Sequence, residues 1–230
     1  MLNGINIELV RKRIKNVYVR VLPPRGQVRI SAPLRMSESA IREFVLSKLV
    51  WIRAHQERIR AREPQAIRSF AEGEEVMVWG RPLRIRFFPV GGRRRIFLCG
   101  EYIDLHMHLS DKPELRRQLF EKLLHRELEQ EIQRLLPLWC STIGVSVPTF
   151  AIRRMRTRWG SCSPTIRRVR FALHLATKSA RFLEYVVVHE LVHLLERSHN
   201  GRFKDYMDRF LPHWRDVRNE MRTDSLCYAS

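Results

Sequence analysis

The sequence has few cysteines, and their arrangement is not one that holds a small fold together. Four occur in 230 residues, at Cys99, Cys140, Cys162 and Cys227, and no two of them form a C-x-x-C pair. We therefore expect neither a disulfide framework nor an all-cysteine zinc site. Reduced thiols are typical of the cytoplasm, and the N-terminal residues lack the apolar segment and cleavage site of a secretory signal. We therefore expect a cytoplasmic protein.

The sequence also lacks a hydrophobic run long enough to span a membrane. The longest nearly uninterrupted apolar stretch, FLEYVVVHELVHLL at residues 182–195, is too short and contains four ionisable groups besides its tyrosine. We expect no membrane partner. The chain contains neither an internal repeat nor a low-complexity segment, and 44% of its residues are hydrophobic. These properties indicate a globular protein with a substantial core.

Acidic residues are scarce relative to basic ones. The chain has 24 Asp and Glu against 43 Lys and Arg, a formal net charge of +19. Divided after residue 110, the charge is +11 in the first part (21 − 10) and +8 in the second (22 − 14), so it is not confined to a basic tail. A charge of this size makes nucleic acid a candidate partner. Because most of the basic residues are arginines, which GC-rich coding alone produces, the charge does not establish that partner.

Hydrophobic periodicity predicts an α+β protein whose N-terminal part, residues 1–110, is β-rich with one helix. Alternating valines at 17, 19 and 21 predict a strand, and Val28 and Ile30 alternate on the return. Ser37 is a candidate N-cap for a helix over about 38–62. Further short strands are predicted up to a domain boundary near residues 108–112.

The second part, residues 111–230, is predicted to be mainly helical with a small sheet. A capping box of Asp111 and Glu114 begins a long helix that reaches about Leu136. After this helix we expect two strands and two helices, over about 147–155, 168–176, 180–197 and 201–222.

The predicted helix at 180–197 is apolar except for one polar stripe. At 100° per residue, Tyr185, His193 and Glu196 all lie within about 40° of His189, while most of the valines and leucines lie on the other side. Burying several polar side chains in one row is costly unless something satisfies them. A metal ion would do so, because histidines at i and i+4 direct their rings at the same point.

The spacing H-E-x-x-H also supplies a base. Glu190 follows the first histidine and lies about 100° round the helix, where it reaches a water bound to a metal rather than the metal itself. In a chain of this composition the motif is expected by chance only about 0.03 times. A catalytic metal needs a third protein ligand. His199, which follows a helix-ending sequence, is favoured over Glu196 because Ser198, Asn200 and Gly201 allow the chain to turn back.

Four motifs in this order resemble those of the YgjP-like metallopeptidase family: RTRWGSCS at residues 156–163, VRFALHLA, LEYVVVHELVHLLERSHNGRF and LPHW. This is a bacterial and archaeal zincin group related to the SprT-like and WLM proteases. The segments around residues 19–33, 51–59 and 72–87 also resemble that family, so the likeness covers nearly the whole chain. It implies a zincin-like catalytic part, one zinc ion on His189, His193 and His199, Glu190 as catalytic base, and a protein or peptide substrate.

The turn RWGSCS at 158–163 and the strand at 168–176 are further candidates for the cleft. The strand is predicted to pair with an extended substrate. Arg158 and Trp159 are candidates for the cleft wall, although Trp159 and Gly160 also suit a tightly packed turn. Tyr185 and Glu196 are candidates for supporting the metal ligands.

Two functions therefore remain open from the sequence. The first is a zinc metalloendopeptidase in which Glu190 activates a metal-bound water to hydrolyse peptide bonds. The second is a basic nucleic-acid-associated protein with a structural zinc, for which only Cys162 or Glu196 is a nearby fourth ligand. A protease acting on nucleic-acid-bound proteins would combine the two.

Overall fold

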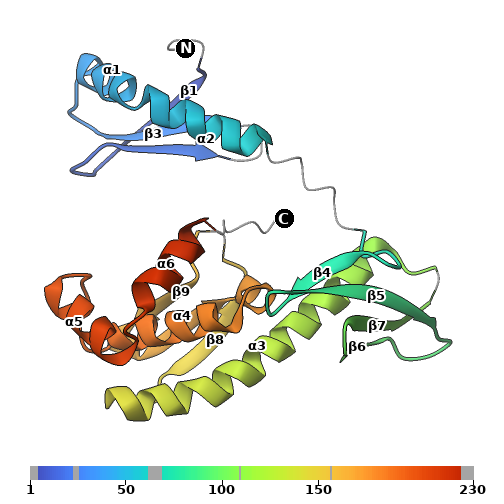
Figure 1. The fold of residues 1–230 in the computed structure, drawn as a ribbon. Helices are drawn as coiled ribbons and strands as arrows, with labels where there is room; N and C mark the ends of the chain where they lie inside the picture. Colours follow the sequence, from blue (N-terminus) through green and yellow to red (C-terminus); the bar gives the residue numbers. More distant parts are fainter. Residues whose placement is uncertain (1–4, 23–25, 62–68, 109, 156, 224–230) are drawn as a thin grey trace. The chain divides into compact units, whose positions relative to one another are not determined.

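The computed structural model describes residues 5–22, 26–61, 69–108, 110–155 and 157–223 and divides the chain into two compact units. The first unit comprises residues 1–67 and the second residues 68–230. Each has a hydrophobic core of its own. In the described part of the chain, no helix is long and apolar enough to cross a membrane. The arrangement is mixed α+β, as predicted (Figure 1).

The first unit is a three-stranded sheet with two helices, in the order β1-β3-β2. The predicted strands are β2 (Tyr18–Leu22) and β3 (Gln27–Pro33), which pair antiparallel with Val19 opposite Ile30. A strand that was not predicted, β1 (Ile7–Lys12), pairs parallel with β3.

The helical segment of the first unit is interrupted, contrary to the single helix expected over about 38–62. It forms α1 (Glu38–Ser47) and α2 (Leu49–Ala61), separated at Lys48. Ser37 is the N-cap of α1, as predicted, and its hydroxyl accepts a hydrogen bond from the N–H of Ala40.

The second unit begins with a four-stranded sheet in the order β4-β5-β7-β6. Its strands are short and alternate between buried and exposed residues: β4 (Glu75–Val78), β5 (Arg81–Pro89), β6 (Arg95–Cys99) and β7 (Tyr102–Met107). Their inner faces pack against the long helix α3 (Pro113–Ile143), which also contacts α4 (Ala180–Val192) further along the unit (Figure 1).

The domain boundary expected near residues 108–112 therefore lies inside this unit. Strand residues such as Ile103 and Leu105 and helix residues such as Leu123 and Leu124 share one core, and all are at most 2% exposed. The structure instead divides the chain between residues 67 and 68. The change from strand to helix between β7 and α3 therefore does not coincide with the division between the two units.

The helix α3 extends to Ile143, about two turns beyond the predicted end near Leu136, although Pro137 lies inside it. Proline removes one helical hydrogen bond and costs about 3 kcal/mol. Burial of Leu136, Cys140 and Ile143 on either side of it offsets that cost, at roughly 1–3 kcal/mol per side chain. The helix ends at Gly144, whose φ of 79° is the left-handed conformation that glycine adopts readily.

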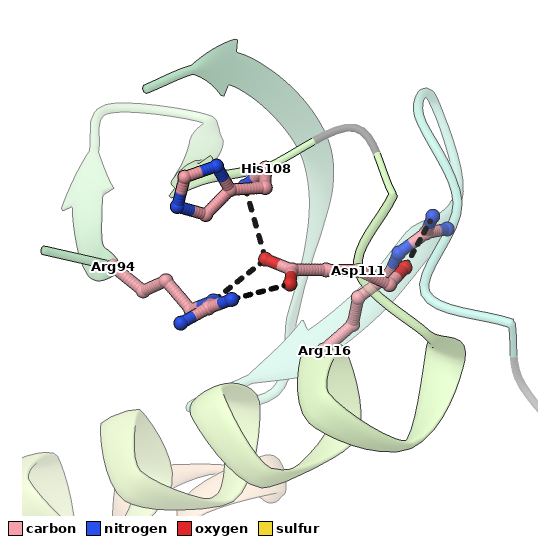
Figure 2. Close-up of polar contacts among 4 residues, drawn as sticks. All are labelled: Arg94, His108, Asp111 and Arg116. Carbon is pink, nitrogen blue, oxygen red and sulfur yellow. Dashed lines mark hydrogen bonds and ion pairs between the residues drawn. The ribbon is translucent and has the colours of Figure 1, made fainter. Parts of the chain in front are cut away.

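The start of α3 differs from the predicted capping box. The N-cap is Lys112, and it makes no side-chain cap hydrogen bond. The carboxylate of Asp111 accepts two hydrogen bonds of 2.7 Å from the Arg94 guanidinium and one of 2.9 Å from the backbone N–H of His108 (Figure 2). Its backbone carbonyl accepts a fourth from Arg116. Asp111 therefore joins the β5–β6 loop to the beginning of α3.

This carboxylate is expected to contribute stability that depends on pH. The Arg94 guanidinium lowers the pKa of Asp111 from 3.8 to about 2, so the contribution is fully present above about pH 4 and is lost as the pH falls through about 2. Asp111→Asn should lower the melting temperature at pH 7 by several degrees and flatten its fall between pH 4 and 2. Circular dichroism during thermal unfolding at each pH measures both effects.

Glu114→Gln is the matched control for Asp111→Asn. Glu114 also pairs with an arginine, Arg117, but its side chain is 66% exposed. Exposed pairs contribute little, so this variant should melt close to wild type. Equal melting temperatures for the two variants at pH 7 would show that the Asp111 contacts do not stabilise the fold.

The rest of the second unit consists of a small sheet followed by helices. The sheet has the order β8-β10-β9, formed by β8 (Thr149–Arg153), β9 (Gly160–Ser163) and β10 (Arg168–Ala172). One-turn 3-10 segments follow β9 and β10, at η1 (Pro164–Ile166) and η2 (Leu173–Thr177). The helices after α4 are α5 (Gly201–Phe210) and α6 (Trp214–Thr223), in place of the single helix expected over 201–222.

Candidate metal centre

The three histidines lie at the end of α4 and in the segment that follows it. His189 is in the last turn of α4, and His193 is its C-cap. The helix ends at Val192, one turn or more before the predicted end near Arg197. The next helix begins at Gly201 with Asn200 as N-cap, so Gly201 does not adopt the left-handed conformation considered for it. His199 is therefore in a short connection between two helices.

This early helix end brings the three histidine rings together. One ring nitrogen from each of His189, His193 and His199 lies within 4.8 Å of those of the other two, an arrangement that could hold a metal ion. The Nε2 atoms of His199 and His189 are 3.0 Å apart. Two nitrogens bound to one tetrahedral zinc at about 2.05 Å would be about 3.3 Å apart, so little movement is needed.

Phe203 of α5 packs against all three rings. The centroid of its ring is 5.0 Å from that of His189, 4.8 Å from His193 and 4.7 Å from His199. Phe203 is 2% exposed. Packing of its ring against the three imidazoles restricts their orientation.

Hydrogen bonds also orient two of the histidines. The Nδ1 of His193 is 3.1 Å from the backbone carbonyl of Glu196. Because a carbonyl only accepts, this Nδ1 carries the proton and the lone pair of the ring is on Nε2. The hydroxyl of Tyr185 is 3.5 Å from Nδ1 of His189, and Tyr185 is buried.

The carboxylate of Glu196 does not join the group of histidines. It accepts a hydrogen bond of 3.1 Å from the backbone N–H of Ser198 and so shapes the turn that leads to His199. In the described part of the chain, the convergent His, Cys, Asp and Glu ligand atoms belong to His189, His193 and His199 alone. The geometry thus groups His199, rather than Glu196, with the other two histidines.

All three imidazoles are neutral at pH 7. Burial and the neighbouring His193, His199 and Arg218 lower the pKa of His189 to about 3. Burial also lowers the pKa of His193, and burial and Arg218 lower that of His199. Neutral imidazole is the form that binds metals, so the protein holds these ligands in the required protonation state.

Glu190 is the acidic group of the site. Its side chain is only 5% exposed, and burial raises its pKa to about 8, although the charge of Arg158 and a hydrogen bond from the backbone N–H of Cys162 act in the opposite direction. A carboxylate with a pKa near neutrality can both accept and release a proton at pH 7.

Gly160 lies directly against Glu190. A Cβ atom at residue 160 would be 2.7 Å from Oε1 of Glu190 and 2.8 Å from Cγ1 of Val186. Real Cβ contacts are essentially never this short, so only glycine allows β9 and α4 to approach so closely. The tight packing expected at Gly160 is present, and the group packed against it is the carboxylate.

A cavity of about 610 Å³ opens over these groups. Arg158 and Trp159, the two candidates for the cleft wall, both line it, and the Trp159 ring packs on His174 with a centroid distance of 4.5 Å. The cavity is lined by residues of β9, α4 and the segments next to them: Arg158, Trp159, Gly160, Ser161, Cys162, Pro164, Tyr185, Val186, His189, Glu190, His193, Arg197 and His199.

The strand next to the site is β9, whereas the sequence pointed to the strand at 168–176 for pairing with a substrate. That prediction is wrong, because β10 is the central strand and pairs with β8 on one side and β9 on the other. In the part of the chain that the structure describes, β9 pairs with β10 only, so no strand is paired with its second edge. It comes from RWGSCS, which was predicted as a turn.

Arg218 is a further charged residue near the histidines, and the sequence did not indicate it. It lies on α6, and its charge helps to lower the pKa of His189 and of His199. Burial raises the pKa of Tyr185, and the charge of Arg218 opposes that rise. It lies 19 residues after His199 and belongs to no motif considered in the sequence. Only the packing of α6 against α4 brings it near the site.

The chain matches one protein family over most of its length and resembles solved structures over a smaller part. A family profile described as the YgjP-like metallopeptidase domain matches residues 15–224. The chain is similar to the metallopeptidase zymogen of Pyrococcus abyssi abylysin, with 17% identity and a TM-score of 0.38 over 40% of this chain and 93% of that one. It is also similar to the metallopeptidase zymogen of Methanocaldococcus jannaschii jannalysin, with 15% identity and a TM-score of 0.37 over 40% and 95%. No curated protein matches.

Proposed function

The chain belongs to the YgjP-like metallopeptidase family, and we propose that it hydrolyses peptide bonds at one zinc ion held by His189, His193 and His199. Family membership supports a metallopeptidase acting on proteins or peptides. The observation that carries the finer proposal is the convergence of three neutral imidazoles beside one buried carboxylate, Glu190.

The donor set fits zinc. Three imidazole nitrogens with one position left open are typical of catalytic zinc, whereas structural zinc has four protein ligands. When bound, the ion supplies a Lewis acid that polarises the substrate carbonyl and acidifies a water molecule. Magnesium and calcium prefer oxygen ligands and do not suit this site.

Glu190 is the proposed catalytic base. Its carboxylate accepts a proton from the attacking water and then donates it to the nitrogen of the leaving amine. Both steps need a group whose pKa lies near the working pH, which burial provides. Contact with Gly160 and the backbone N–H of Cys162 keep the carboxylate in one position.

The free edge of β9 is the proposed site for the peptide backbone. An extended substrate that pairs with Gly160–Ser163 would continue the sheet as an additional strand. The same strand lines the cavity over Glu190, so pairing brings a peptide bond to the metal centre. Trp159 forms part of the wall. Tyr185 supports His189 through its hydroxyl group. Glu196 supports His193 through its backbone carbonyl.

A nucleic-acid-associated protein with a structural zinc is the weaker alternative. Its support is the net charge of +19. The three-histidine group contains neither Cys162 nor Glu196, which were the candidates for a fourth ligand. Three donors favour a catalytic ion over a structural one.

Removal and return of the metal tests the proposal. Dialysis against a chelator should abolish hydrolysis of a quenched fluorescent peptide library, and one equivalent of zinc should restore it. Magnesium should not restore it, because its coordination requires oxygen ligands. Undiminished hydrolysis by the metal-free chain would contradict the proposal, as would full recovery with magnesium alone.

Gly160→Ala should impair hydrolysis without removing the metal. The added Cβ displaces the carboxylate of Glu190, and a misplacement of about 1 Å at a reacting group costs about 100-fold in rate. Gly91→Ala, outside the cavity lining, is the matched control, because a Cβ there would meet nothing within 4 Å, and it should remain close to wild type. The kcat and zinc content of both variants are the measurements, and a fully active Gly160→Ala enzyme would show that β9 does not position Glu190.

A further inference from the structure

The cavity over the metal centre has positively charged walls. Two arginines line it, Arg158 just before β9 and Arg197 in the segment after α4, and both are exposed. Glu190 is the one acidic residue among the residues lining the cavity, and it is buried. A divalent cation on the histidines would add further positive charge. A bound substrate therefore meets cations from more than one element.

Neither of these arginines forms an ion pair among the described residues, unlike others of the same unit. Other arginines of the same unit form ion pairs, as Arg154 does with Glu121 and Arg181 with Glu220. Within the described residues, neither Arg158 nor Arg197 has a carboxylate within ion-pairing distance. The carboxylate of Glu196, next to Arg197 in sequence, accepts a hydrogen bond from the backbone N–H of Ser198. The charge of Arg158 acts on the buried carboxylate of Glu190, but the two groups form no ion pair among the described residues.

Arg218 adds to the same field from α6. Its charge acts on Tyr185, His189 and His199, and among the described residues its one ring contact is with Trp214, at 5.7 Å from the guanidinium carbon to the ring centroid. Three exposed guanidinium groups thus act on one small volume. Guanidinium binds carboxylates through paired hydrogen bonds, so a substrate that carries carboxylates would be both attracted and oriented.

We propose that the preferred substrates are peptides with acidic side chains close to the scissile bond, bound by Arg158 and Arg197. This inference rests on the proposed peptidase function and adds the substrate class. Each contact between one of these arginines and a substrate carboxylate should be as strong as an exposed ion pair. Together the contacts should make kcat/KM about tenfold higher for an acidic peptide than for a neutral one. The advantage should shrink in high salt, because salt screens exposed charges.

Two fluorogenic peptides that differ only in acidic residues test the proposal. One carries Asp and Glu on both sides of the cleaved bond, and the other carries Asn and Gln at the same places. For the zinc-loaded full chain, the ratio of kcat/KM between them should be about ten at low salt and fall towards one at 1 M salt. Arg158→Gln and Arg197→Gln should each lower that ratio several-fold, while Arg209→Gln, on α5 outside the cavity lining, should leave it unchanged.

A binding measurement separates this inference from the proposed function. Fluorescence anisotropy of the two peptides with the zinc-loaded Glu190→Gln chain should show the same preference without any hydrolysis. Equal affinities and equal kcat/KM values would overturn the acidic preference and leave the peptidase function intact. Tighter binding of the acidic peptide with no hydrolysis by wild type would support the preference while contradicting the peptidase function. Equal peptide affinities together with tight, salt-sensitive binding of a single-stranded oligonucleotide would assign the arginines to nucleic acid and overturn the proposal.

Discussion

Glu190→Gln is expected to lower kcat for peptide hydrolysis by about 10²- to 10⁴-fold while zinc remains bound. The range is that of a general base removed from an otherwise intact site. Glutamine has nearly the same shape as glutamate, so it fits beside Gly160, but its amide does not accept a proton from water. Because the metal is proposed to be held by the histidines, its affinity should change little.

The measurement combines kinetics with metal analysis on the same preparation. Zinc content by mass spectrometry should be one ion per chain for wild type and for Glu190→Gln. Hydrolysis within a few-fold of wild type would show that Glu190 is not the base. Loss of zinc in this variant would show instead that the carboxylate belongs to the metal site.

His199→Ala is expected to weaken zinc binding by at least about 100-fold. Apparent zinc affinities of roughly 10–16 kcal/mol are shared among a few ligands, so each contributes about 3 kcal/mol or more. Hydrolysis should be lost with the metal. Competition with a zinc-binding dye gives the dissociation constant.

Glu196→Ala is the matched comparison, because residue 196 lies on the same turn and was the alternative third ligand. Its carboxylate bonds to the N–H of Ser198, and its contact with His193 is made by the backbone carbonyl, which alanine keeps. The variant should lose less than tenfold in zinc affinity. Zinc lost from Glu196→Ala and retained by His199→Ala would contradict the proposed ligand set.

Periodicity was sufficient to place part of the candidate site. The 3.6-residue repeat put His189 and His193 on one helix face, and the structure has their ring centroids 4.9 Å apart. A helix end was also predicted before His199, although it comes earlier, at Val192. After Val192 the chain forms tighter turns, in which the N–H groups of Leu194 and Leu195 donate to carbonyls only three residues back. His193 is therefore the C-cap.

Strand β9 could not be predicted from the sequence in the same way. It has four residues, Gly160–Ser163, and these small or polar residues show no alternation of hydrophobicity. Its position is determined by pairing with β10 and by close packing of Gly160 on α4. Both are contacts between segments distant in sequence, as is the approach of Arg218 from α6.

The division of the chain was also hidden from local patterns. Alternation in strands β4 to β7 shows that one face is buried but does not show against what. The partner is α3, which follows them, so strands and helix form one unit.

Anomalous diffraction at the zinc edge, from crystals of the full chain grown with zinc, tests the central claim most directly. We expect one strong peak within about 2.0–2.1 Å of a ring nitrogen from each of His189, His193 and His199, with one coordination position not taken by protein. A peak coordinated by Cys162 or by the carboxylate of Glu196, or a closed site with four protein ligands, would contradict the claim.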